Sequence, residues 1–348
     1  AVRGPQQMNN KGRFDMFGRI VSFAAALAVA SMMAAAPAAA KITLKGGHIN
    51  QPQSPLGLGF QKFADLVKEK SKGEIEVKVF PASQLGSIDA QYENLTAGSQ
   101  DVMIELLEWY GRWDKRFAIF GLPYLWRDRD HMQQFLATDR FRKDMIGALE
   151  KKVGAKFLTK KFTWNFMLDR TLLCKKPVFK PADLEGLKLR MFQSRIPVLS
   201  WKTLGAAIQI IPWGETYTAL ATGTVDCITA RVEAHYNMKQ TEVAKFITVT
   251  KEFYQVYVPL LSQKTVAKLT PAQLAIIEEA AYEAGEWFTQ FGVSMMDTYK
   301  EKVKNEHGVS IIEPPLKPWQ DKMRPAYATF EKEGEIPAGM VDFIADLK

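Results

Sequence analysis

The 348-residue chain is poor in cysteine and histidine, with two and four residues of these types, respectively. Two cysteines, Cys174 and Cys227, exclude a disulfide-rich scaffold, a four-cysteine zinc site and a CxxC redox motif. The histidines form neither an HExxH motif nor a pair four residues apart; they are His48, His131, His235 and His307. The sequence therefore indicates no metal site and no cofactor.

The two cysteines are 53 residues apart, and two interpretations of them remain open. Two buried thiols are favoured, because cysteine often serves as a small apolar core residue. A single disulfide bridge is the alternative, and it requires an oxidising compartment.

The chain lacks a strong excess of either charge. It holds 46 basic and 38 acidic residues, a net charge of +8, and residues 41–348 alone hold 42 and 37, a net charge of +5. This mild excess excludes the basic footprint of a nucleic-acid-binding protein. The composition, 47% hydrophobic and 24% charged, is that of a globular protein and excludes disorder.

Long apolar runs are absent after residue 40, but the first 40 residues contain one. Basic residues at Lys11, Arg13 and Arg19 precede an apolar stretch at 20–36, and Ala38-Ala39-Ala40 follows it. This order predicts a cleaved secretory signal, with a retained anchor as the less favoured alternative. Residues 1–7 precede the first Met, and we set them aside as upstream sequence. The remaining chain is expected to be exported and soluble.

Strand and helix patterns alternate through residues 41–348, which predicts an α/β fold with two lobes. We expect parallel sheets covered by helices, with lobe I at 41–164 and completed by about 254–290. Lobe II is predicted at 165–253, completed by about 291–348. Thr270-Pro271 begins a long helix that we expect to brace both lobes.

Catalytic templates are missing as well. The sequence contains no GxSxG elbow, no GxxxxGK[ST] loop and no GxGxxG motif placed after a strand. Glu105 and Glu108 could form a carboxylate pair, but at this spacing we expect them on a solvated face. No catalytic residue is therefore predicted.

Two arginines end apolar runs of the second lobe and are the strongest chemical signal. Arg170 follows an aromatic run, and Arg190 ends the alternating segment 187–191. Ligands of open α/β sheets bind beyond the carboxyl ends of the strands. A guanidinium there would hold a carboxylate through two parallel hydrogen bonds, which lysine cannot reproduce. Taken alone, each arginine is more often part of a surface or structural ion pair, so these positions need further support.

The order of several motifs resembles the DctP-type solute-binding proteins of tripartite ATP-independent periplasmic (TRAP) transporters. The resemblance covers nearly all of 41–310 and is carried by HINQPQSP (48–55), FADLVKEKSKGEIEVKVFPASQLGS (63–87), GLPYLWRD (121–128), KPVFKPADLEGLKLRMF (176–192) and GAAIQIIPWGETYTALATGTVD (205–226). It implies a periplasmic-binding-protein-like fold in which two lobes close about a hinge. It also implies that Arg190 is the carboxylate clamp and Arg170 a second donor.

The chain departs from the family pattern after Val225. The usual Asn contact is absent from the segment Asp-Cys-Ile-Thr-Ala-Arg, so Arg231 or Thr229 is expected to occupy that wall. Trp213 is expected either to contact the ligand or to pack in the core, and Glu215 to cap the following helix.

The first lobe offers further candidates for the facing wall, each with a structural alternative. They are His48, Gln84, Trp109 and Tyr110. A hydrogen-bonded loop histidine is the stronger interpretation of His48, and core packing is an equal alternative for the two aromatic residues.

Together, these patterns favour a periplasmic receptor that binds a small organic acid and delivers it to a sodium-coupled TRAP permease. We expect a monomer or weak dimer that binds no nucleic acid. The alternatives are a secreted enzyme with Glu105 or Glu233 as its base, and a receptor for an ATP-driven importer. The patterns do not define which carboxylate is bound.

Overall fold

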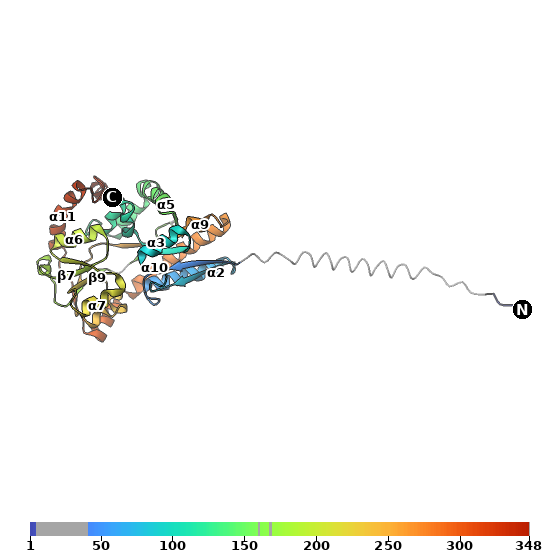
Figure 1. Cartoon of the computed structure of the whole chain (residues 1–348), viewed down its shortest axis with the longest axis horizontal. Helices are drawn as coiled ribbons and strands as arrows, with labels where there is room; N and C mark the ends of the chain where they lie inside the picture. The colour runs from blue at the N-terminus through green and yellow to red at the C-terminus, as the bar shows by residue number, and fades with distance from the viewer. Residues whose placement is uncertain (5–40, 159–160, 167–168, 348) are drawn as a thin grey trace. The chain divides into compact units, whose positions relative to one another are not determined.

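The structure is a computed structural model that describes residues 1–4, 41–158, 161–166 and 169–347. The chain divides into two units, Ala1–Lys41 and Ile42–Lys348, and the description below concerns the second (Figure 1). The predicted signal segment at 8–40 lies outside the described residues. Among the described helices, none is both long and apolar enough to cross a membrane.

The first of two sheets has strand order β2-β1-β3-β11-β4, and β5 also pairs with β11. Its strands are β1 (Ile42–Gly47), β2 (Ile75–Phe80), β3 (Val102–Leu106), β4 (Ala155–Phe157), β5 (Asn165–Phe166) and β11 (Gln255–Ser262). Strands β1 and β2 are parallel and α2 (Pro55–Lys70) connects them, which agrees with the predicted alternation of strands and helices. Helix α2 begins where the Ser54 hydroxyl accepts a hydrogen bond from the Gly57 amide.

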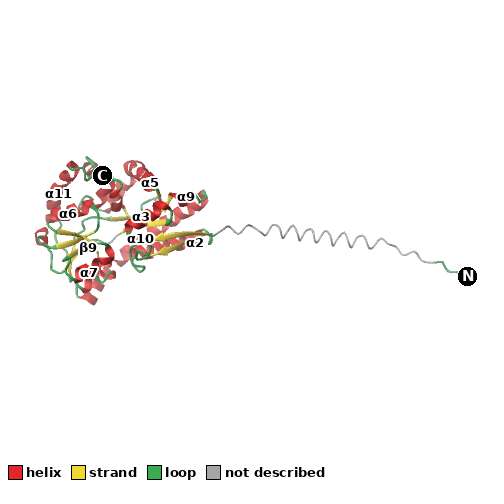
Figure 2. Cartoon of the chain, viewed as in Figure 1, coloured by secondary structure: helices red, strands yellow, loops and turns green. Residues whose placement is uncertain are grey.

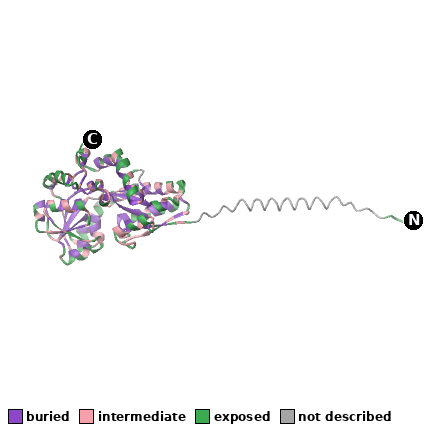
Figure 3. Ribbon diagram, turned by 45° about the horizontal axis from the view of Figure 1, so that its top comes forward, coloured by how far each residue is buried: buried purple, intermediate pink, exposed green. Residues whose placement is uncertain are grey.

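The second sheet has strand order β12-β10-β6-β9-β7-β8. Its strands are β6 (Arg170–Cys174), β7 (Lys188–Met191), β8 (Ala207–Ile210), β9 (Cys227–Arg231), β10 (Phe246–Val249) and β12 (Ser310–Ile312). Both sheets lie between helices, and their strands are largely buried (Figures 2 and 3). The two-lobed α/β fold is therefore confirmed.

The prediction of parallel sheets is wrong, because both sheets are mixed. Strand β11 runs antiparallel to β3, and β6 runs antiparallel to β9. Each of these strands follows a segment that arrives from the other sheet: β6 comes after β5, and β11 comes after β10. A chain that crosses between sheets can enter from the opposite end, whereas a helical crossover within one sheet returns in parallel.

The remaining helices cover the two sheets. They are α3 (Ile88–Ala97), α4 (Arg129–Ala137), α5 (Gly147–Val153), α6 (Arg195–Leu204), α7 (Thr216–Ala221), α8 (Val232–Asn237), α9 (Gln263–Val266), α10 (Pro271–His307), α11 (Lys317–Lys332) and α12 (Met340–Ala345). Helix α3 starts after a turn in which residues 82 and 83 adopt left-handed conformations.

Helix α10 confirms the predicted long helix and packs against elements of both halves, including α2, β5 and α8. Its start is a capping box in which the Thr270 hydroxyl accepts from the Gln273 amide and the Gln273 side chain accepts from the Thr270 amide. The helix continues through Gly285, where a Cβ atom would lie 2.6 Å from Cδ1 of Trp164. Glycine is needed there for close approach of the two elements.

The sequence places all of 291–348 with lobe II, and β12 and α11 do pack with the second half, but the last helix, α12, contacts the first half. Ring nitrogen Nε2 of His131, on α4, lies 2.7 Å from the carbonyl oxygen of Ile344, on α12. The rings of Phe135 and Phe343 meet edge to face, with centroids 6.3 Å apart. Strand β5, just beyond the predicted division at 164, likewise still pairs within the first sheet.

The preferred interpretation of the cysteines as free thiols is wrong. Cys174 and Cys227 form a disulfide between β6 and β9, and both are buried. They are direct cross-strand partners, with Cα atoms 4.2 Å apart. Only the antiparallel register of the two strands brings them together, and their spacing in sequence does not reveal it.

Candidate functional site

A pocket of about 80 Å³ opens between the two sheets, at the edge where the strand ends of both meet. The second sheet contributes Arg170, Arg190 and Arg231 to its wall, while Glu105 and Tyr257 come from β3 and β11 of the first. Its full lining is Ile49, Asn50, Glu105, Leu106, Trp109, Arg170, Arg190, Phe192, Trp213, Thr229, Ala230, Arg231, Ala234, Gln255 and Tyr257. The structure thus brings together the three predicted arginines.

Strand register explains this convergence. Arg170 is the first residue of β6 and pairs directly with Arg231, the last residue of β9. Strand β7 runs parallel to β9, so Arg190, near its carboxyl end, lies at the same edge of the sheet. Arg170 was expected at a strand's carboxyl end, but it reaches this edge because β6 is antiparallel.

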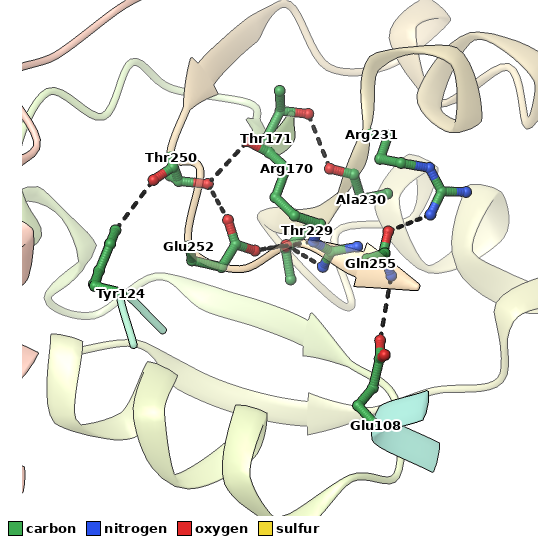
Figure 4. Close-up of polar contacts among 10 residues, drawn as sticks. All are labelled: Glu108, Tyr124, Arg170, Thr171, Thr229, Ala230, Arg231, Thr250, Glu252 and Gln255. Atoms are coloured by element: carbon green, nitrogen blue, oxygen red, sulfur yellow. Dashed lines mark hydrogen bonds and ion pairs between the residues drawn. The ribbon is translucent and has the colours of Figure 1, made fainter. Parts of the chain in front are cut away.

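Arg170 is held in a buried network that Figure 4 shows. Its Nε donates to Oε1 of Glu252 at 3.1 Å, and its Nη2 donates to the Thr229 hydroxyl at 2.6 Å. That hydroxyl donates in turn to Glu252 at 2.8 Å, and the Thr250 hydroxyl donates to the other carboxylate oxygen. Glu252 lies on the segment 250–254 that connects the two sheets, so this network ties the connection to the pocket wall.

Arg231 is also paired. Its Nε donates to Oε1 of Glu233 at 2.8 Å, and its Nη1 donates to the side-chain oxygen of Gln255. The bond from Arg231 to Gln255, on β11, links the second sheet to the first, and Gln255 then donates through Nε2 to Glu108 at 3.2 Å (Figure 4). Burial alone would lower the pKa of Arg231, but the carboxylate of Glu233 outweighs it and raises that pKa above its usual value.

Arg190 differs from both. It is 3% exposed, and its Nε donates to the backbone carbonyl of Ile211 at 2.8 Å. Its guanidinium carbon lies 5.4 Å from the ring centre of Trp213, a cation–π distance. Among the described residues, no carboxylate forms an ion pair with it. Burial and the charge of Arg170 lower its pKa to about 9, so the group remains charged at neutral pH.

The expectation that Glu105 and Glu108 lie on a solvated face is wrong, because both are 2% exposed. Glu105 belongs to β3, a central strand that is buried on both faces, and Glu108 follows in a tight turn at 107–112. Burial raises the pKa of Glu105 to about 8 and that of Glu108 to about 7. Glu105 is therefore mainly a neutral acid at neutral pH.

Aromatic side chains form the outer part of the site. Trp109 and Phe192 pack with ring centres 5.1 Å apart. Together with Trp213 and Arg190 they also line a larger chamber of about 390 Å³, which is adjacent to the inner pocket and shares these residues with it. The pocket therefore has a charged inner end and an apolar mouth.

Three predicted wall residues do not line this pocket. His48 is buried behind it against Phe60, with a ring-centre distance of 5.6 Å, and burial lowers its pKa to about 4. Tyr110 lies in the core against Phe157, which favours the packing alternative. Gln84 is exposed on a turn.

Glu215 is exposed and precedes helix α7, but its side chain makes no capping hydrogen bond with the helix. It lines the outer chamber instead. The expected cap is therefore not formed.

Several lining residues were missed by the sequence analysis, including Asn50, Phe192, Gln255 and Tyr257. Phe192 directly follows the strand that carries Arg190, so its position in the sequence next to a predicted site residue could have indicated it. Gln255 and Tyr257 lie on a strand that crosses into the first sheet, and no local pattern indicates that crossing. Within the described ranges, no group of three or more His, Cys, Asp or Glu side chains is arranged to hold a metal ion.

A pocket between two α/β halves, entered from solvent and rich in buried arginine, defines a bilobal solute-binding protein. The sequence model described as bacterial extracellular solute-binding protein, family 7 (DctP), matches residues 46–333. The chain therefore belongs to this family.

Curated relatives and solved structures support the same assignment. The sialic acid-binding periplasmic protein SiaP of Vibrio cholerae is 28% identical, over 88% of this chain and 93% of the relative. The 2,3-diketo-L-gulonate-binding periplasmic protein YiaO of Escherichia coli is 28% identical, over 78% and 80%. A TRAP periplasmic solute binding protein from Ochrobacterium anthropi with bound L-fuconate is 27% identical, with a TM-score of 0.81 over 89% of this chain and 100% of that chain.

These findings confirm the resemblance noted in the sequence. The chain is a TRAP-type solute-binding protein, and the family to which it belongs consists of binding proteins rather than enzymes.

Proposed function

We propose that this protein is a receptor that binds a small carboxylate in the inner pocket, with Arg190 as the clamp. Lobe closure around the ligand, without bond making, is its mechanism. Arg170, whose Nε and Nη2 are already engaged, supplies a second contact from Nη1. The arginine pair Arg170 and Arg231 shapes the wall and its potential, while Arg190 meets the acid group directly.

One observation carries this proposal: Arg190 is buried and charged, yet no carboxylate of the described residues pairs with it. A buried charge without a partner is costly, so a protein retains it where a ligand completes the pair. The planar guanidinium offers two parallel donors to a carboxylate, and each charge-assisted bond contributes about 1.5–3 kcal/mol.

The receptor acts outside the cytoplasm and delivers its ligand to a TRAP permease. Three observations support this location and partner. The sequence at 8–40 has the order of a secretory signal. The disulfide between Cys174 and Cys227 is typical of an oxidising compartment. The printed names of the curated relatives are those of periplasmic binding proteins.

A thermal-shift screen of small carboxylates, followed by calorimetry on the best one, tests the proposal. A ligand at about one hundred times its Kd raises the free energy of unfolding by about 2.7 kcal/mol. We then expect Arg190→Lys to weaken binding at least about tenfold while leaving the fold intact, because lysine keeps the charge but loses the fork geometry.

The matched control is Arg195→Lys, at an exposed arginine that pairs with Glu335 outside the inner pocket. It should leave affinity unchanged. Equal affinity of wild type and Arg190→Lys would refute the clamp assignment.

A further inference from the structure

The charges of the pocket leave one positive charge available to a ligand. Arg170 pairs with Glu252 at 3.1 Å, and Arg231 pairs with Glu233 at 2.8 Å. Each of these pairs is neutral overall. Among the described residues that line the two adjacent chambers, Arg190 is the one cation without a carboxylate partner. A single negative charge on a ligand therefore balances the site.

A second negative charge would find no partner. Glu105 lines the inner end next to Arg231, and its burial keeps it mainly protonated. The charged residues of the outer chamber, apart from Arg190, are the acids Glu215 and Asp89, and Asp89 forms an ion pair with Arg112. A second carboxylate on the ligand would thus meet no further cation of the described lining that lacks a carboxylate partner, and its desolvation would remain uncompensated.

The space beyond Arg190 is lined by apolar and aromatic surfaces. Trp109 and Phe192 pack together on one side, and Trp213 lies against the guanidinium. Ile210, at 51% exposure, is one of the few large apolar side chains left open to solvent, and it lines the same chamber. Such walls favour a flat apolar body by stacking and by burial of its surface.

Two of the polar side chains that line the inner pocket are already engaged within the protein, and Asn50 is a further amide in its lining. The Thr229 hydroxyl is engaged by Arg170 and Glu252, and the Gln255 amide is engaged at both ends by Arg231 and Glu108. Hydroxyl groups buried without partners lower affinity, so a polyhydroxylated acid is disfavoured there.

From these contacts we infer that the receptor selects a monocarboxylate with an aromatic body over dicarboxylates and sugar acids. The inference rests on the proposed function, since it takes Arg190 as the carboxylate clamp. The acid group would sit in the inner pocket of about 80 Å³, and the ring would lie in the outer chamber between Phe192 and Trp213.

Calorimetry on the purified chain, freed of ligand, tests this with four probes. Phenylacetate carries one charge and a ring, phenylmalonate adds a second carboxylate, phenylacetamide removes the charge, and glucuronate replaces the ring by hydroxyl groups. We expect phenylacetate to bind at least about tenfold more tightly than each of the other three.

The outcomes separate this inference from the proposed function. If phenylmalonate or glucuronate binds as tightly as phenylacetate, the inference is overturned and the carboxylate receptor stands. If phenylacetamide equals phenylacetate, or if none of the carboxylates binds, both are overturned.

A pair of variants tests the aromatic wall directly. Phe192→Ser should lower the ratio of phenylacetate affinity to glucuronate affinity by about tenfold, because the ring loses its stacking partner. Phe179→Ser is the matched control, since Phe179 is 57% exposed and lies outside both chambers. Circular dichroism should show that both variants are folded. An unchanged ratio of phenylacetate affinity to glucuronate affinity in Phe192→Ser would then overturn the aromatic selection.

Discussion

The three arginines of the inner pocket differ in how their charges are balanced, and they form a balanced end (Arg170 and Arg231) and an unbalanced end (Arg190). At one end, Arg170 and Arg231 each have a buried carboxylate within 3.1 Å of Nε. At the other end, Arg190 has a backbone carbonyl and the face of Trp213. The first arrangement serves the folded state, because every charge is balanced within the protein. The second leaves a charge unbalanced, which favours a ligand at the expense of stability.

The largest loss of stability should come from removing a carboxylate partner at the balanced end. Glu252→Gln leaves the buried Arg170 without its counter-charge, and we expect a loss of about 3–5 kcal/mol in the free energy of unfolding, measured by urea denaturation. Glu335→Gln is the control, because it removes the partner of Arg195, whose side chain is 65% exposed. That variant should lose less than about 1 kcal/mol. Similar losses in both would contradict the distinction.

A pH series on Glu105, which faces Arg231 and Glu108, gives a smaller change. In the folded protein the pKa of Glu105 is about 8, above the ordinary value of 4.5. The contribution of Glu105 to the free energy of unfolding is therefore fully present below about pH 4.5 and is lost as the pH rises through 8. Glu105→Gln stays neutral throughout. At about pH 9 we expect the free energy of unfolding of the wild type to have fallen by on the order of 2 kcal/mol, whereas that of the variant does not show this loss.

Thermal unfolding at several pH values measures this difference. Glu69→Gln, on the exposed side of α2, is the control and should follow the wild type. Glu108 titrates in the same window, since burial raises its pKa to about 7, so a residual slope should remain in Glu105→Gln. Parallel curves for Glu105→Gln and wild type would show that Glu105 is ionised in the folded protein.

At the unbalanced end, removing the charge of Arg190 should raise the stability of the ligand-free chain instead of lowering it. Arg190→Gln removes a buried charge that lacks a partner, so we expect the ligand-free chain to gain about 1 kcal/mol in stability while carboxylate binding is lost. Arg170→Gln should lose stability instead, because Glu252 is then unpaired. Differential scanning calorimetry of the two variants without ligand decides this. A lower unfolding temperature for Arg190→Gln would mean that its contacts with Ile211 and Trp213 dominate.

The smallest effect is expected at Gln84. This residue is exposed and lines neither chamber, so Gln84→Ala should change ligand affinity by less than about twofold. Titration of the same carboxylate into wild type and variant measures it. A tenfold loss would place Gln84 in the closed site after all.

Much of the local structure could be predicted, because its causes are local. The helix start at Thr270-Pro271 depends on capping within one turn, and the strand at 75–80 depends on alternation of neighbouring residues. The arginines at strand ends were also visible as polar residues that close apolar runs. Their common edge was not, because it depends on β6 running antiparallel to β9.

The errors share one physical origin. Glu105 was predicted on a solvated face because carboxylate pairs at this spacing are usually exposed, yet β3 is a central strand with β11 beside it. Cys174 and Cys227 looked like separate thiols, yet register makes them cross-strand partners. In each case the environment comes from a strand that crosses between the two sheets.

By itself, the sequence determined the family, the two-lobed α/β pattern and the arginines that could meet an acid, since these depend on residue type and short-range order. Only the tertiary structure decided that Arg170 and Arg231 are neutralised by carboxylates, while no carboxylate of the described residues pairs with Arg190. The reason is that a charge's partner is set by distance in space, and the carboxylates concerned come from separate segments: Glu252 from the connection between the sheets and Glu233 from the helix after β9.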